Sequence, residues 1–162
     1  MFTEAVSAEQ ASAFSRFLGV PILSANLVGP KVDRHVYLTS ALSHSGHVFL
    51  DPDIGIRVDR KGKSNCAAYV FVDELVEIVN ARPESLTAVF DQSLARGRER
   101  AQLEGKLTLL LGRGIHGFAY LSHACFVFLG LNEGVVHQGF ETVRRESRLP
   151  VCRFVSTWSL EL

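Results

Sequence analysis

Three aspartates and a glutamine stand at the ends of two apolar runs, where their side chains could do chemistry. Asp51 and Asp53 follow the first run, and Asp91 and Gln92 follow the second. The carboxyl ends of neighbouring parallel strands meet at one edge of a sheet, where ligands bind. Convergent carboxylates favour a hard cation. We therefore expect Asp51, Asp53 and Asp91 to bind Mg²⁺ or Mn²⁺ and, with Gln92, to form a catalytic centre.

A structural role is the alternative for the same aspartates. Asp51 would cap a loop, Asp53 would make an Asx turn, and Asp91 would cap the following helix. The two interpretations differ in what the carboxylates contact. A cluster of all three within reach of one cation supports an enzyme, whereas carboxylates that accept backbone N–H groups support a structural role.

Basic side chains flank these aspartates in the sequence. Lys63 belongs to a basic loop that follows Asp53, and Arg96 belongs to a group of arginines that follows Asp91. We expect Lys63 and Arg96 to hold a phosphate, because cationic side chains pair with phosphate oxygens; the alternative is that both are solvated charges. His123, at a bend in an apolar segment, is the histidine expected to contact the ligand. Lys106 is expected on the surface.

Helical and strand-like patterns alternate along the chain and would position these side chains. Continuously apolar runs such as 47–50 and 86–90 are typical of parallel strands covered on both faces. The expected fold is α/β, a three-layer, mostly parallel Rossmann-like sheet with helices on both faces. Apolar spacing and turn residues predict helices at about 7–18, 33–45, 70–82, 95–112 and 134–147, and strands at about 21–25, 47–50, 86–90, 118–129 (as one strand or two) and 151–158.

One domain is expected over residues 1–162. Its first part, 1–32, would hold a helix and a short strand, and the main sheet would occupy 33–158. The residues expected to be buried in its core are Phe49, Val89, Phe90, Leu107, Phe126 and Phe128.

Composition excludes several classes of protein. The 162 residues are 47% hydrophobic, and 17 basic residues balance 17 acidic ones, so the chain is neither a disordered tail nor strongly charged overall. Three widely spaced cysteines give neither a disulfide framework nor a zinc motif, and Cys125 is expected to be a buried, inert thiol. The first residues lack signal-peptide character, and no apolar stretch is long enough to span a bilayer. A cytoplasmic protein without membrane contact is expected.

Four short motifs lie within residues 33–129: Val48–Gly55 (VFLDPDIG), Lys61–Lys63 (KGK), Asp73–Leu75 (DEL) and Val89–Ser93 (VFDQS). Together they resemble a family of uncharacterised bacterial and phage proteins, whose members carry a D-P-D-x-G strand end, a basic loop, a D-E-L helix and a strand that ends in glutamine. The resemblance implies the latter half of a methyltransferase-like Rossmann fold, with Asp51-Pro52-Asp53 at the place of the D-P-P-Y-type motif of amino-methyltransferases.

Three functions follow as hypotheses. The first is metal-dependent hydrolysis of a phosphodiester or nucleotide at the carboxyl end of the sheet, with a nucleotide or nucleic acid as substrate. The second is a module that binds a nucleotide-like ligand without chemistry. The third is an interaction protein, such as a homodimer, in which the acidic strand ends are only caps. A degenerate methyltransferase ranks below these three, because Asp53 and Ile54 replace the last two residues of its motif.

Overall fold

The computed structural model describes residues 12, 15–16, 34–58, 68–122 and 125–160. The chain forms two compact units, 1–43 and 44–162. In the first unit, helix α2 spans Arg34–Ser43, and residues 12, 15 and 16 are also helical. The helix expected at 7–18 therefore falls mostly outside the described residues, and the strand expected at 21–25 falls entirely outside them.

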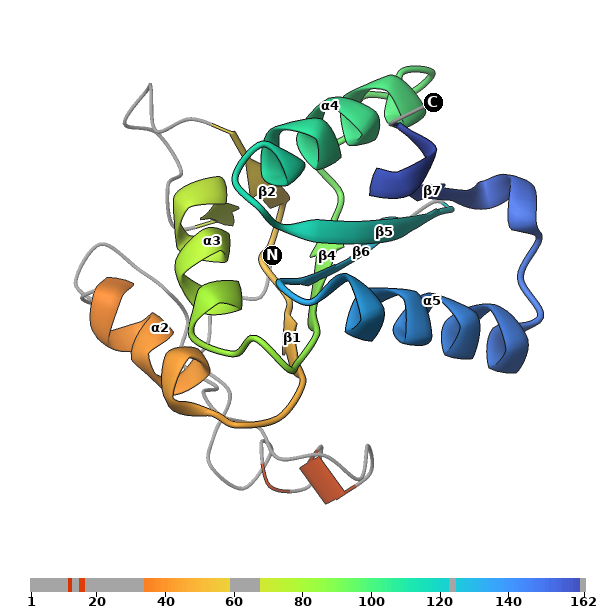
Figure 1. Cartoon of the computed structure of the whole chain (residues 1–162). Coiled ribbons are helices and arrows are strands. Elements are labelled where there is room, and N and C mark those ends of the chain that lie inside the picture. Colours follow the sequence, from red (N-terminus) through yellow and green to blue (C-terminus); the bar gives the residue numbers. More distant parts are fainter. Residues whose placement is uncertain (1–11, 13–14, 17–33, 59–67, 123–124, 161–162) are drawn as a thin grey trace. The chain divides into compact units, whose positions relative to one another are not determined.

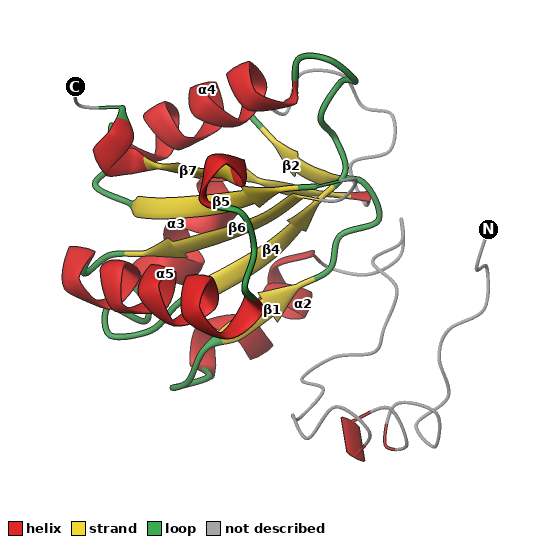
Figure 2. Ribbon diagram, turned by 90° about the vertical axis from the view of Figure 1, so that its right-hand side faces the viewer, coloured by secondary structure: helices red, strands yellow, loops and turns green. Residues whose placement is uncertain are grey.

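A five-stranded sheet forms the centre of the second unit, in the order β1-β4-β6-β5-β7. Figure 2 shows these strands side by side, with β1 and β7 at the two edges. The pairing alternates in direction except at one edge: β1 and β4 run parallel, and every other neighbouring pair is antiparallel. The bounds are β1 Val48–Leu50, β4 Thr87–Asp91, β5 His116–Leu121, β6 Cys125–Gly130 and β7 Phe154–Ser156.

The expected Rossmann-like sheet is therefore wrong. The expected strands lie close to the observed ones in the sequence, but most of them run antiparallel to their neighbours and not parallel. The segment 118–129 splits into β5 and β6, in which Leu121 lies opposite Cys125. A parallel connection needs about a dozen residues or more, so the three residues between these strands permit only an antiparallel hairpin. Once β6 lies against β4, Asp91 faces Cys125 and the rest of the sheet is antiparallel.

A second, smaller sheet was not expected, because one of its strands falls in the loop that follows Asp53 and the other overlaps the start of the helix expected at 70–82. Strands β2 (Gly55–Arg57) and β3 (Tyr69–Phe71) pair in parallel. Ile56 and Val70 at the centre of the pair are buried, so even three-residue strands contribute to the core. The residues between them, 59–67, lie outside the described part of the chain, and Lys63 is among them.

One face of the main sheet packs against helices α3 (Val72–Asn80) and α4 (Glu99–Leu111). The buried side chains of each helix recur every three or four residues, which is the spacing of one helix face. Glu74 caps α3 by accepting a hydrogen bond from Phe71 N at 2.9 Å. This core joins both helices to the sheet through Val72, Leu75, Val79, Leu103, Leu107, Leu110, Val89, Val127 and Leu129.

The opposite face packs against helix α5 (Glu133–Ser147), so that α4 and α5 lie on opposite sides of β5 and β6 (Figure 1). Asn132 caps α5 by accepting hydrogen bonds from Gly134 N and Val135 N. Phe118 stacks on Phe128 at 4.7 Å between ring centroids.

After α5 the chain forms two short 3-10 helices, η2 (Val151–Arg153) and η3 (Thr157–Ser159), on either side of β7. Trp158 of η3 stacks on His137 at 4.3 Å and meets the edge of Phe140 at 5.4 Å. No helix in the described part of the chain has both the length and the apolar character needed to cross a membrane.

The predicted core is confirmed at two positions and wrong at one. Val89 and Leu107 are fully buried, whereas the Phe49 side chain is 56% exposed. The other three, Phe90, Phe126 and Phe128, are half-buried.

Candidate functional site

Asp91 is the last residue of β4, and its side chain is fully buried. Both carboxylate oxygens have donors. Oδ2 lies 2.6 Å from the ammonium nitrogen of Lys106 on α4. Oδ1 accepts hydrogen bonds from Ser93 N at 3.0 Å and from Ile56 N at 3.2 Å. The carboxylate is therefore compensated by a cation and by two backbone N–H groups, as a buried charge requires.

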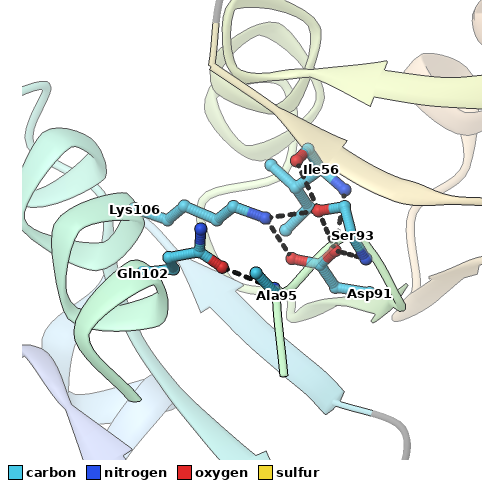
Figure 3. Close-up of polar contacts among 6 residues, drawn as sticks. All are labelled: Ile56, Asp91, Ser93, Ala95, Gln102 and Lys106. Carbon is cyan, nitrogen blue, oxygen red and sulfur yellow. Dashed lines mark hydrogen bonds and ion pairs between the residues drawn. The ribbon is translucent and has the colours of Figure 1, made fainter. Parts of the chain in front are cut away.

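Ser93 completes the network around this carboxylate (Figure 3). Its hydroxyl oxygen lies 2.6 Å from Asp91 Oδ1 and 3.1 Å from the carbonyl oxygen of Ile56. Lys106 also donates to Ser93 Oγ, at 2.7 Å. The expectation that Lys106 lies on the surface is wrong, because the residue is 9% exposed.

Gly55 allows β2 to approach this network closely. Its φ of +131° belongs to the region that favours glycine. A Cβ at this position would lie 2.9 Å from the Cα of Asp91 and still closer to its carboxylate. Gln92 N, just after β4, donates to the carbonyl of Ile54, just before β2, at 2.9 Å. Asp91 thus joins β2 and α4 to the end of β4.

The three predicted metal ligands do not form one cluster among the described residues. Asp51 and Asp53 follow β1 with exposed side chains, whereas Asp91 is buried and paired with Lys106. Among the described residues, no three His, Cys, Asp or Glu side chains are placed to hold a metal ion. Burial, followed by the nearby Asp53 carboxylate, raises the pKa of Asp51 above its ordinary value. The neighbour that repels Asp51 is thus Asp53 and not Asp91.

Ser93 and Lys106 have the residue types of a nucleophile and its base, but their contacts are wrong for that chemistry. A general base must accept the proton of the nucleophile. Here Lys106 Nζ donates to Asp91 Oδ2 and to Ser93 Oγ and does not accept the serine proton. The serine hydroxyl points its own proton at Asp91 or at the Ile56 carbonyl. These contacts join α4, the end of β4 and the loop that follows it.

Of the other predicted site residues, the structure describes Gln92 and Arg96. Gln92 and Arg96 are exposed, and Arg96 lies in the loop before α4. Lys63 and His123 lie outside the described residues. Phosphate binding by Lys63, Arg96 and His123 stays a prediction.

A shallow hollow of about 370 Å³ lies between the start of α4 and the end of β5. Arg100 and Arg153 line it, but Arg100 already donates to the Cys152 carbonyl at 2.7 Å. Hydrogen bonds from the backbone N–H groups of Glu99 and Gly97 lower the pKa of the Glu99 carboxyl. The carboxylate of Glu99 thus accepts hydrogen bonds from two backbone N–H groups at or just before the start of α4.

An aromatic cluster with one exposed ring, Phe49, was missed by the sequence analysis. Phe49 lies on the edge strand β1, and its ring is 6.4 Å from that of Phe126 on β6. Phe126 in turn lies 5.2 Å from Phe90 on β4. We call these three residues the β1 aromatic face. The signal available in the sequence was the shortness of the run before Asp51-Pro52, because edge strands are often short and bounded by proline.

The D-P-D-x-G motif of the family resemblance spans the connection from β1 to β2. Its first residue, Asp51, follows β1, and its glycine, Gly55, begins β2 against Asp91. The motif therefore has a structural task, which is to bring β2 to the end of β4. In comparisons with known proteins, neither a family model nor a curated protein matches this chain.

Proposed function

We propose that this protein is an interaction module that binds a protein partner through the β1 aromatic face, and not a metal-dependent hydrolase. The observation that carries the proposal is the exposure of Phe49 at the centre of an edge strand. The contacts of Asp91 support the proposal, since its carboxylate accepts hydrogen bonds from Lys106 and from two backbone N–H groups. That is the outcome expected of an interaction protein whose acidic strand ends only stabilise the fold.

The β1 aromatic face has the chemistry of a docking surface. Exposed Phe49 continues into the half-buried rings of Phe90 and Phe126, so the apolar surface here is larger than that of one isolated side chain. Phe49, Phe90 and Phe126 come from three adjacent strands and form a continuous row of rings. Helix α5 packs on β5 and β6, toward the other edge of the sheet. Aromatic residues in such a position contribute large contact area at a small cost in side-chain entropy.

The approach to β1 is held rigidly, so Phe49 is presented in a fixed position. Arg82 is buried and donates to the carbonyl of Gly46 at 3.2 Å. Ser85 Oγ donates to the carbonyl of Ser45, also at 3.2 Å. His47 Nδ1 accepts a hydrogen bond from Leu86 N at 2.9 Å. A surface that is ordered before binding loses less conformational entropy when a partner binds.

Site-specific photo-crosslinking in the cells that naturally contain the protein tests this proposal. A photoreactive phenylalanine analogue replaces Phe49 in the full chain. The matched control carries the same analogue at Val151, which is 59% exposed but lies outside the β1 aromatic face. We expect a protein adduct from position 49 and none from position 151. Mass spectrometry then identifies the partner in the adduct.

Two results would reject the proposal. One is equal adduct formation from both positions, which would show that position 49 reacts only because it is exposed. The other is an adduct that joins position 49 to another part of the same chain, because the aromatic surface would then be covered within the molecule.

A further inference from the structure

The open edge of β1 has backbone groups available for pairing. Val48 N donates to the carbonyl of Leu86 at 3.0 Å, so the peptide groups of Val48 face β4. Successive residues of a strand direct their N–H and C=O groups to opposite edges. The N–H and C=O of Phe49 therefore face away from β4. Among the strands that the structure describes, none pairs with this edge.

Only a short, extended segment is available at this edge. The strand β1 has three residues, and Pro52 follows closely and cannot donate a backbone hydrogen bond. An incoming strand would therefore have to find its partners between about His47 and Asp51, with Phe49 at the centre. Such strand addition is a common way for one chain to bind another.

The side chains on either side of Phe49 complement each other in an antiparallel arrangement. His47 precedes Phe49 by two residues and Asp51 follows it by two, and both are exposed. Because Nδ1 of His47 accepts a hydrogen bond from Leu86 N, the ring proton is on Nε2. That N–H is the donor that a carboxylate such as Asp51 of another molecule would accept.

We propose that the partner at the β1 edge is a second copy of this chain, paired antiparallel about a two-fold axis through Phe49. This inference rests on the proposed function. Phe49 then lies opposite Phe49 of the second copy and exchanges two backbone hydrogen bonds with it. His47 of each copy lies opposite Asp51 of the other. One surface is thus complementary to itself, which is the condition for an isologous dimer.

The dimer is expected to be weak. Stable protein interfaces bury about 800 Å² on each partner, and β1 offers only three residues with the β1 aromatic face beside them. The two five-stranded sheets would join into one continuous sheet across the axis. Dimer formation should therefore depend on protein concentration in the micromolar range and above.

Analytical ultracentrifugation of the full chain over that range measures the association directly. We expect Phe49→Lys to weaken it by about tenfold or more, since a lysine on an edge strand opposes pairing. Val151→Lys, an equally exposed position outside the β1 aromatic face, should leave it unchanged. Urea denaturation of both variants verifies that they are folded.

A disulfide locates the two-fold axis. In a background with Cys66→Ser and Cys152→Ser, Phe49→Cys should form a disulfide-linked dimer, because residues directly opposite in antiparallel strands lie about 5.5 Å apart. Val151→Cys should not. A monomer at every concentration, or a dimer that Phe49→Lys leaves intact, would overturn the inference.

The photo-crosslinking experiment separates failure of the dimer from failure of the interaction module. An adduct between position 49 and a second copy supports both. An adduct with a different protein supports the interaction module and overturns the dimer. Absence of any intermolecular adduct from position 49 overturns both.

Discussion

Asp91 illustrates how one buried carboxylate fixes the positions of three chain segments. Its two oxygens are shared among Lys106 of α4, Ile56 of β2 and Ser93 of the following loop. Removal of any one donor would leave the buried Asp91 carboxylate incompletely paired. Breaking a buried ion pair costs more free energy of unfolding than breaking an exposed ion pair. The network is therefore a determinant of stability.

Replacement of Lys106 by methionine tests this at a single position. The variant keeps most of the side-chain volume but leaves Asp91 buried without its cation, so we expect the free energy of unfolding to fall by about 3–5 kcal/mol. Urea denaturation at neutral pH measures it. Arg113→Met is the control, because the ion pair of Arg113 with Asp73 at 3.4 Å is exposed and should contribute less than about 1 kcal/mol. Equal losses in the two variants would contradict the structural role of Asp91.

The two cysteines in the described part of the chain should differ in reactivity. Burial, followed by the negative charge of Asp91, raises the pKa of the Cys125 thiol to about 12, although Lys106 opposes the shift. At about pH 8 roughly one Cys125 thiol in ten thousand is ionised, and the thiolate is the reactive form. Cys152 is exposed.

Iodoacetamide labelling followed by peptide mass spectrometry compares them. We expect Cys152 to be alkylated in the native protein and Cys125 only after denaturation. If Cys125 were alkylated in the native protein as fast as Cys152, the end of β4 would be open to solvent.

At the scale of elements, the contact between β2 and the end of β4 depends on the absence of a side chain at position 55. Gly55→Ala would place a methyl group against Asp91 in a backbone conformation that favours glycine. We expect a loss of about 1–3 kcal/mol or more in the free energy of unfolding. Gly105→Ala is the matched control in α4. It meets no atom within 4 Å and should gain about 0.5–1 kcal/mol in helix propensity. If Gly55→Ala were as stable as the wild type, β2 would not be docked as described.

The elements were partly predictable from the sequence, for physical reasons that differ among them. Helices with a clear apolar period, such as α3 and α5, were located to within a few residues because their apolar side chains recur on one face. β2 and β3 were missed because three residues are too few to show a period. β1 was placed correctly as a strand, but its position at the edge, and hence the exposure of Phe49, depends on pairing that no local pattern encodes.

At the scale of the whole molecule, the direction of the strands was the quantity that the sequence could not supply. An apolar run is compatible with either direction, and the two differ in how the ends of the strands meet. Asp51 and Asp91 do lie at the ends of two neighbouring parallel strands, β1 and β4, as expected. The donor that compensates Asp91 comes from α4, fifteen residues further along the chain, where Lys106 was expected on the surface. The interpretation of Asp91 as a metal ligand therefore left out the side-chain cation that pairs with it.

Divalent cations should accordingly leave the stability of the whole protein unchanged. A ligand that binds the folded state raises Tm by mass action. Because Lys106 compensates Asp91, we expect millimolar Mg²⁺ or Mn²⁺ to shift Tm neither in the wild type nor in Asp51→Asn. Differential scanning calorimetry measures both. A rise in the wild type that is absent from Asp51→Asn would restore the metal site and, with it, the hydrolase hypothesis.

The stack of Trp158 on His137 also has a spectroscopic consequence. Trp158 is the only tryptophan in the chain, so the whole indole emission of the protein originates at η3. The wavelength and intensity of this emission therefore report the docking of η3 on α5, where the Trp158 ring contacts both His137 and Phe140. The β1 edge has no chromophore of this kind. Fluorescence is thus a selective optical probe of one end of the sheet, and comparison with circular dichroism would show whether that end separates before the helices unwind.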